Sequence, residues 1–190
     1  ADAAAHPGSV GIPLPLHDLR IVDDALREVP AGVVGEIMGR GPILMPGYHR
    51  QPGLTQAAIV DGWLRTGDLG FVDEAGYLHL VDRQKDLIIS GGVNVYPRDI
   101  EEIITRHPAV REAAVFGAPH PRWGESPIAA VLLKAGAVIE ADQLREWVNA
   151  NVAARFQRIT ELQIHQDFPR NAAGKTLKRE LRASHLSHGA

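Results

Sequence analysis

Cysteine is absent from the 190 residues of the chain. This absence excludes a disulfide framework, a thiol nucleophile and any zinc or iron–sulfur site built on cysteine ligands. No apolar run approaches the roughly 20 residues that span a bilayer, and residues 1–10 lack the basic and apolar segments of a secretory signal. We therefore expect a soluble, cytoplasmic protein without a transmembrane segment.

Apolar residues make up 45% of the chain and charged residues 23%, a composition that predicts folding around hydrophobic cores. The net charge is −3, but the charges are unevenly distributed. Residues 1–82 contain 5 basic and 11 acidic side chains, whereas residues 155–182 contain seven basic and three acidic ones. This basic region favours a phosphate-bearing partner, although on charge alone a solvated helix surface is the simpler interpretation. We expect no nucleic-acid partner.

Short β-branched runs, separated by glycine and proline, fill the first part of the chain and predict strands. They occupy residues 19–22, 33–39, 62–66, 71–72 and 76–81. Their spacing of about ten residues is typical of a small antiparallel barrel or sandwich. Residues 73–76 have the composition of a hairpin turn. We therefore predict an all-β domain over residues 1–82.

After residue 82, the spacing of apolar residues changes from that of strands to a mixture of helical and strand spacing. Pro97 suits the first position of a helix, and the isoleucines that follow it form one apolar stripe. Periodicity also predicts helices at residues 140–152 and 177–181, and strands at residues 113–117, 128–133 and 162–165. These elements predict an α+β domain over residues 83–190, with a short three-stranded sheet flanked by helices. The polar residues 82–86 are the expected linker.

Four stretches contain residue types suited to ligand binding. They are Gly35-Glu36-Ile37 with Gly41-Pro42 and Gly47-Tyr48, residues 61–68, residues 82–97 and residues 168–175. In the second stretch, the Asp68 carboxylate follows a Thr-Gly turn and could accept two neighbouring hydroxyls, such as those of a ribose. The alternative is an aspartate that caps its own loop. Arg83 could contact the same sugar or a phosphate, or form an ordinary surface salt bridge.

The last two stretches contain flexible backbone beside possible ligand contacts. Gly91 and Gly92 permit backbone conformations that suit either a tight turn or the close passage of a thin ligand. Lys175 follows Gly174 in a loop of proline, glycine and asparagine, which predicts a mobile, exposed position. A lysine there is ordinarily solvated, and it gains a function only if an anion must be bound transiently.

The order and spacing of these four stretches resemble the superfamily of adenylate-forming enzymes, which includes acyl-CoA synthetases, adenylation domains of nonribosomal peptide synthetases and firefly-type luciferases. The resemblance extends from about Val10 to about Arg182. It implies an ATP-dependent acid–thiol ligase. A fatty or aryl carboxylate would attack the α-phosphate of ATP and release pyrophosphate, and the thiol of CoA would then displace AMP. Mg²⁺ would arrive with ATP, because the histidines are scattered and no metal site built by this chain is expected.

The resemblance also assigns roles to individual residues. Lys175 corresponds to the catalytic lysine, whose charge stabilises the α-phosphoryl oxygens in the transition state. Asp68 would hold the ribose hydroxyls, and Arg83 would support the nucleotide from the start of the linker. Lys85 falls on the hinge about which the C-terminal domain rotates between the two half-reactions.

A passage for the pantetheine arm of CoA is implied as well. Gly91 and Gly92 would line this passage and Trp123 would border it, although a loop tryptophan that covers the core is an equal alternative. Phe156 and Arg158 lie where related ligases contact the nucleotide of CoA. At this point the chain reads Gln-Arg-Ile, whereas the family usually has Lys-x-Pro.

The family's Ser/Thr/Gly-rich phosphate loop and its Tyr-Gly-x-Thr-Glu stretch are absent from the sequence. We therefore expect residues 1–82 to be the distal β subdomain of the N-terminal adenylating domain, and residues 83–190 to be the mobile C-terminal domain. The expected partner is the missing part of the N-terminal domain, without which the chain would be inactive. Two alternatives stay open: a non-catalytic module that binds a nucleotide, CoA or a protein, and an adenylation domain that loads a carrier protein.

Overall fold

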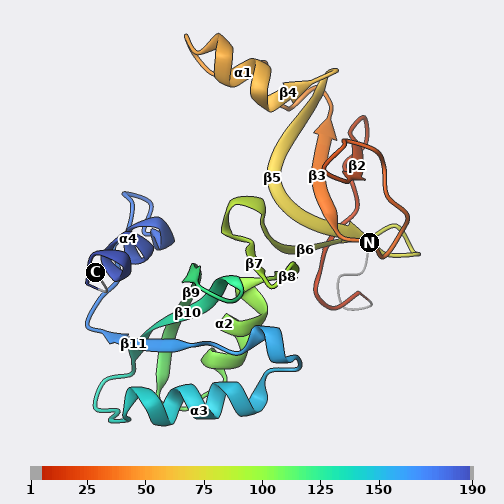
Figure 1. Cartoon of the computed structure of the whole chain (residues 1–190). Coiled ribbons are helices and arrows are strands. Elements are labelled where there is room, and N and C mark those ends of the chain that lie inside the picture. The colour runs from red at the N-terminus through yellow and green to blue at the C-terminus, as the bar shows by residue number, and fades with distance from the viewer. Residues whose placement is uncertain (1–5, 189–190) are drawn as a thin grey trace. The chain divides into compact units, whose positions relative to one another are not determined.

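The computed structural model describes residues 6–188, and its elements fall into two units, residues 1–85 and residues 86–190 (Figure 1). The division lies within the polar segment 82–86 that was expected to be the linker. Residues 1–5, which belong to the segment examined for a secretory signal, lie outside the described residues. Among the described residues, no helix is both long and apolar enough to cross a membrane.

The first unit is built on one antiparallel sheet. Its strands are β1 (Ser9–Gly11), β2 (Asp18–Val22), β3 (Gly35–Arg40), β4 (Ile59–Val60), β5 (Trp63–Val72) and β6 (Leu78–Arg83). Hydrogen bonds connect them in the order β1-β6-β5-β3-β2, with β4 beside β5. The predicted antiparallel pairing is confirmed, but within residues 6–188 this order does not close on itself. The strands therefore form an open sheet and not a barrel or a sandwich.

Two predictions for the first unit differ from the structure in detail. The strands expected at residues 62–66 and 71–72 are one continuous strand, β5, which curves strongly (Figure 1). Gly67, one of the two glycines between them, lies in a bulge and does not end the strand. The short helix α1 (Pro52–Ala58) was not predicted, because it buries no residue and so has no apolar stripe.

The second unit is an α+β domain, as predicted. It contains β7 (Ile88–Ser90), β8 (Val93–Val95), α2 (Pro97–Thr105), β9 (Val110–His120), β10 (Gly124–Leu133), α3 (Ala141–Asn151), β11 (Glu161–His165) and α4 (Lys178–His188). Strand β10 pairs antiparallel with β9 and parallel with β11. These are the three predicted strands. The sheet has five strands and not three, because the hairpin of β7 and β8 joins β10 through Ser90 and Gly124.

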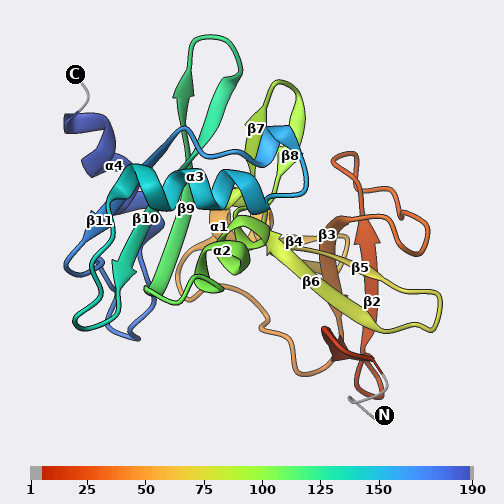
Figure 2. The ribbon, with the colours of Figure 1, turned by 90° about the horizontal axis from the view of Figure 1, so that it is seen from below.

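Successive side chains along the strands of the second unit point to opposite faces of the sheet, and each face has its own hydrophobic core. Val115 on β9 and Val131 on β10 face the cluster that includes Ile100 and Leu144 of helices α2 and α3. Neighbouring residues such as Phe116 face the opposite cluster, which α4 completes. The sheet is thus covered by α2 and α3 on one face and by α4 on the other, and Figure 2 shows α3 crossing in front of β9 and β10.

Candidate active site

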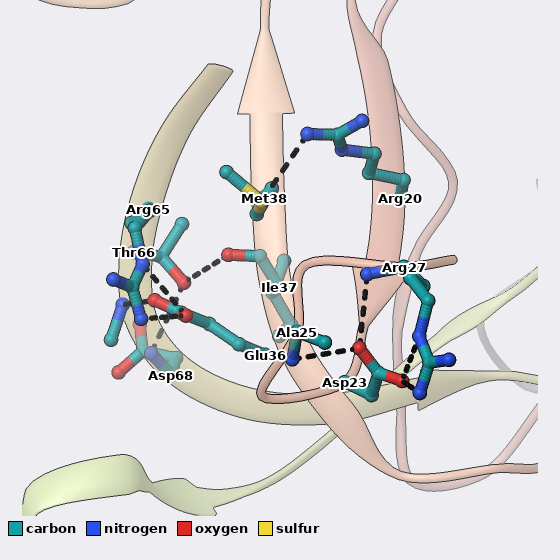
Figure 3. Close-up of polar contacts among 11 residues, drawn as sticks. Arg20, Asp23, Ala25, Arg27, Glu36, Ile37, Met38, Arg65, Thr66 and Asp68 are labelled. Atoms are coloured by element: carbon teal, nitrogen blue, oxygen red, sulfur yellow. Dashed lines mark hydrogen bonds and ion pairs between the residues drawn. The ribbon is translucent and has the colours of Figure 1, made fainter. Parts of the chain in front are cut away.

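A buried carboxylate in the first unit shapes the turn that presents Asp68. Between paired residues on β3 and β5, the segment Thr66–Asp68 lies opposite the single residue Ile37, so β5 bulges there. Glu36 fills this bulge with a side chain that is only 5% exposed. Its Oε2 accepts hydrogen bonds of 2.9 and 2.6 Å from Nε and Nη2 of Arg65 (Figure 3).

Further hydrogen bonds close the same bulge. The Thr66 hydroxyl donates to the Ile37 carbonyl at 2.7 Å and accepts the Asp68 amide at 3.1 Å (Figure 3). The Gly67 amide points to Oε1 of Glu36 at 3.3 Å. Gly67 has a φ of +69°, a conformation that glycine adopts without steric cost. The hydrogen bond that Arg65 donates to Glu36 raises the pKa of Arg65 above its usual value.

The register of β5 and β6 places Asp68 opposite Arg83. Oδ1 of Asp68 and Nε of Arg83 are 3.0 Å apart, and their side chains are 34% and 46% exposed. Both groups are therefore partly open to a ligand that offers hydroxyls or phosphate. Arg83 belongs to β6 and not to the linker, because the β5–β6 pairing continues through residues 82 and 83.

Lys175 lies in the second unit on a hydrogen-bonded turn. Oδ1 of Asn171 accepts the amides of Ala173 and Lys175 at 3.0 and 2.9 Å, and the Asn171 amide donates to the Lys175 carbonyl at 3.0 Å. Gly174 supports the turn with a φ of +79°. The sequence predicted a mobile, exposed element: Lys175 is exposed, the mobility stays a prediction, and the asparagine side chain gives the turn internal hydrogen bonds. The Lys175 ammonium is exposed and forms no ion pair within residues 6–188.

Glu112 on β9 attaches this turn to the sheet. Its Oε2 is 2.6 Å from Nη2 of Arg170, and its Oε1 accepts the Thr176 hydroxyl at 2.9 Å. Hydrogen bonding from Arg170 lowers the pKa of the Glu112 carboxyl, against the opposing effect of burial. The carboxylate therefore stays ionised at neutral pH.

The two glycines expected to line a passage form the turn of the β7–β8 hairpin. Gly91 and Gly92 have φ values of +58° and +80°. The Gly91 amide donates to the Trp123 carbonyl at 2.8 Å, and a Cβ added at Gly91 would lie 3.0 Å from the indole ring. Trp123 is 41% exposed, and Arg122 lies 4.6 Å from its ring centroid. The structure thus brings Gly91, Gly92 and Trp123 together, and the tryptophan is not a core residue.

Phe156 and Arg158 lie in and just after the 3₁₀ turn η3 (Arg155–Gln157), which contacts β8. Both side chains are exposed. Asn149 of α3 holds the segment in place, because its side chain exchanges hydrogen bonds of 2.8 and 3.0 Å with the backbone of Ile159. The segment of Phe156 and Arg158 is therefore held beside β8, one of the two strands of the glycine hairpin.

The two groups of candidate residues in the second unit lie at opposite ends of β9. Glu112, near the start of the strand, holds the turn of Lys175, whereas Trp123 follows His120 at the end of the strand. At about 3.3 Å per residue, these ends are roughly 25 Å apart. The structure therefore does not bring Lys175 together with Gly91, Gly92 and Trp123. Lys85 lies in the 3₁₀ turn η2 (Gln84–Asp86), where the two units meet in the chain.

Sequence reasoning missed the carboxylates that support these residues. Glu36 stands in a stretch that was singled out, but it received no role because its partner Arg65 is 29 positions away. Glu112 gave no signal, because a single acidic residue before an apolar strand is common on protein surfaces. Among residues 6–188, no group of three or more histidine, aspartate or glutamate side chains is placed to hold a metal ion.

Comparison with known proteins gives the family. A family model described as AMP-binding enzyme matches residues 1–49, and one described as AMP-binding enzyme C-terminal domain matches residues 99–175. The chain is 45% identical over 175 residues to a 2-succinylbenzoate–CoA ligase from Bacillus cytotoxicus, which covers 92% of this chain and 36% of the relative. It is 39% identical over 176 residues to a long-chain-fatty-acid–CoA ligase from Bacillus subtilis, covering 92% of this chain and 31% of the relative.

A solved structure agrees with these relatives. The o-succinylbenzoate CoA synthetase from Bacillus subtilis, in complex with its acyl-adenylate intermediate, superposes with a TM-score of 0.87 at 36% identity. The match covers 95% of this chain and 36% of that chain. The chain thus spans about a third of the length of the relatives that it matches. The matched segments include both units and the turn of Lys175, and the chain belongs to the family of AMP-binding, adenylate-forming enzymes.

Proposed function

We propose that this chain forms part of an AMP-forming acyl-CoA ligase that joins a carboxylic acid to CoA at the expense of ATP. The observation that carries the proposal is the exposed ammonium of Lys175 on a hydrogen-bonded turn, without an ion-pair partner in the described part of the chain. A fixed cation of this kind can meet two anionic reactants without first losing a protein partner. The relatives named as CoA ligases support the choice of an acid and CoA as substrates.

In the first half-reaction, a carboxylate oxygen attacks the α-phosphorus of ATP, and the bond from that phosphorus to pyrophosphate breaks. The Lys175 ammonium would offset the negative charge that gathers on the α-phosphoryl oxygens. Asp68 would accept hydrogen bonds from the ribose hydroxyls, and Arg83, at 3.0 Å, would hold that carboxylate in place. Mg²⁺ would enter with ATP.

In the second half-reaction, the sulfur of CoA attacks the acyl carbon, the bond to AMP breaks, and the thiol proton passes to solvent. Gly91, Gly92 and Trp123 would border the pantetheine arm, while Phe156 and Arg158 would contact the nucleotide of CoA. Lys175 and the β7–β8 hairpin lie at opposite ends of β9. Rotation of the second unit as a rigid body would therefore bring first Lys175 and then the hairpin to the reacting groups. Lys85 would supply the hinge for this rotation.

The whole ligase would include contacts that this chain does not provide, because the chain spans 36% of the 2-succinylbenzoate–CoA ligase. Residues 1–85 would then adjoin the remainder of the adenylating domain, and residues 86–190 would move against it. We expect the chain by itself to be inactive. The relatives support an aryl or a fatty acid as substrate, and a cytoplasmic location is part of this proposal.

The test uses a chimera in which this chain replaces the aligned 175 residues of the Bacillus cytotoxicus ligase. We expect the chimera to exchange labelled pyrophosphate into ATP when the acid is present. Lys175→Ala should reduce this exchange by about 100-fold or more, since one preorganised charge at a transition state is worth that much. Thioester formation from a supplied acyl-adenylate should fall far less.

Lys134→Ala is the matched control, because Lys134 is another exposed lysine of the same unit without an ion pair among the described residues. Its pyrophosphate exchange should equal that of the parent chimera. Equal exchange in the Lys175→Ala and Lys134→Ala chimeras would contradict the proposed role of Lys175.

A further inference from the structure

We propose that Glu112 is a positioning residue for Lys175, because its one carboxylate holds both ends of the turn that carries the lysine. The catalytic consequence of this inference rests on the proposed function. The attachment of the Lys175 turn to β9 by Glu112 does not depend on that function, and it can be measured in the 190-residue chain alone.

The two oxygens of Glu112 bind the two sides of the turn. Arg170 and Thr176 face each other in an isolated antiparallel bridge, and Lys175 lies between them in the chain. Oε2 of Glu112 is 2.6 Å from Nη2 of Arg170, and Oε1 accepts the Thr176 hydroxyl at 2.9 Å. Because each oxygen is committed to a different side, the carboxylate fixes the separation and the tilt of both.

Arg170 closes this arrangement from within the turn. Its Nη1 donates to the Gly174 carbonyl and to the Thr176 hydroxyl, each at 3.2 Å. The guanidinium thus links Glu112 directly to the residue before Lys175. A planar group with several fixed donors is suited to such a junction, whereas a lysine at position 170 could not make all these bonds at once.

The turn has little else to orient it against the sheet. Residues 171–175 are all exposed, so no apolar packing holds them. Phe168 and Leu181 are buried on either side of the turn, but they anchor the segment only at its ends. Among the described residues, Glu112 is the only side chain of another element that hydrogen-bonds to residues 169–177.

The position of Glu112 makes it a firm attachment. It lies on β9, opposite Leu132 of β10, in the sheet of the second unit. The side chains of Glu112 and Arg170 are 34% and 33% exposed, so their charges are only partly screened by water. A shift of about 1 Å in a catalytic group is enough to cost on the order of 100-fold in rate, and Glu112 limits such a shift of the Lys175 backbone.

The first measurement is amide hydrogen exchange in the 190-residue chain. The Lys175 amide donates to Asn171, and the Leu177 amide donates to the Pro169 carbonyl. In Glu112→Gln we expect both amides to exchange about 10-fold faster than in the native chain, because local opening becomes easier. Asp142→Asn, which removes an ion pair of 3.0 Å on α3 of the same unit, should leave both rates unchanged.

The second measurement uses the ligase chimera. Glu112→Gln should reduce pyrophosphate exchange by about 10- to 100-fold and leave thioester formation from a supplied acyl-adenylate almost unchanged. A residue that only stabilises the unit would lower both half-reactions together. The double variant with Arg170→Gln should lose little more than either single variant, because the two residues act as one attachment.

The outcomes separate this inference from the proposed function. Normal amide exchange in Glu112→Gln, or an equal loss in both half-reactions, overturns the positioning role of Glu112. Reduced pyrophosphate exchange in Lys175→Ala but not in Glu112→Gln also overturns the positioning role and leaves the proposed function standing. Unchanged pyrophosphate exchange in Lys175→Ala overturns the proposed function and the catalytic consequence of the inference, whereas the attachment is still decided by amide exchange in Glu112→Gln.

Discussion

A carboxylate inside a sheet is stable only when its oxygens are hydrogen-bonded, and Glu36 meets this condition through Arg65 and Gly67. The same bonds shape the bulge from which Asp68 faces Arg83. Glu36 has no proposed ligand contact, yet it determines where Asp68 lies, the residue proposed to bind the ribose. Glu112 does the same for Lys175 in the other unit.

We expect Glu36→Ala to lower the free energy of unfolding by about 1–3 kcal/mol, because it leaves the Arg65 guanidinium without its anion. The lower end of that range allows for the exposure of Arg65, whose side chain is 35% accessible. Urea denaturation of the 190-residue chain gives the value.

Asp18→Ala is the control for this prediction. Asp18 and Arg40 form an ion pair of the same 2.6 Å length on the same sheet, but their side chains are 58% and 55% exposed. Removing this exposed pair should change the stability very little. Equal losses from the two substitutions would show that burial of Glu36 does not determine the strength of its pair.

The sequence predicted some of these residues better than others. Asp68 and Arg83 were expected to share one ligand, and they are in contact, although their roles stay predictions. Glu36 and Glu112 could not be predicted, because their partners lie 29 and 58 positions away. Only the strand register and the path of the chain bring such pairs together, and a single sequence does not specify either.

At the scale of elements, the β7–β8 hairpin shows how two glycines define a turn. Gly91 and Gly92 both have positive φ, as a two-residue turn of the type I′ kind requires. The strands on either side have three residues each, too few for a hydrophobic period to show in the sequence. The sequence therefore indicates the turn through its glycine pair but does not indicate the strands on either side.

Gly92→Ala should lower the free energy of unfolding by about 1 kcal/mol, because alanine at a φ of +80° is strained. A Cβ at Gly92 would meet no atom within 4 Å, so strain is the whole effect. Gly92→Asn should cost less, since asparagine tolerates this conformation. Thermal unfolding of the two variants provides the measurement, and equal losses would show that the backbone conformation is not responsible.

The elements with clear periodicity were predicted correctly. Helix α2 begins at Pro97, and its residues Ile100 and Ile104 are fully buried on the face that packs against the core. Strand β5 was divided in two because its Thr-Gly-Asp segment has the composition of a turn. The bulge that accommodates these residues depends on Glu36 of the neighbouring strand, so local sequence could not reveal it.

At the scale of the whole molecule, the two units meet in the chain at a 3₁₀ turn that contains Lys85. Proline fixes φ near −65°, a value that such a turn already uses. In the ligase chimera, Lys85→Pro should therefore keep the fold but hinder a rotation about this residue. We expect the ratio of pyrophosphate exchange to thioester formation to change by about tenfold or more.

Lys85→Ala is the matched control for the hinge, because it removes the same charge and leaves φ free. Its ratio of the two half-reactions should equal that of the parent chimera. If Lys85→Pro lowered both half-reactions equally, or neither, rotation at this residue would not be needed for the reaction.

The overall organisation could be predicted because four separate stretches agreed with one family. The α+β class and the family are confirmed. The interpretation of the two units as parts of a longer ligase stays a prediction, because the chain spans only about a third of its relatives.

The separation of Lys175 and Trp123 along β9 has a consequence for protein engineering. Within residues 6–188, different side chains hold the two ends: Glu112 binds Arg170 at one end, and His120 accepts the Arg122 and Trp123 amides at the other. Under the proposed function, the end that carries Arg122 and Trp123 could therefore be redesigned for a nucleophile other than CoA while the end that holds Lys175 is kept. A library directed at Arg122 and Trp123 in the ligase chimera should then yield new acceptors with pyrophosphate exchange unchanged.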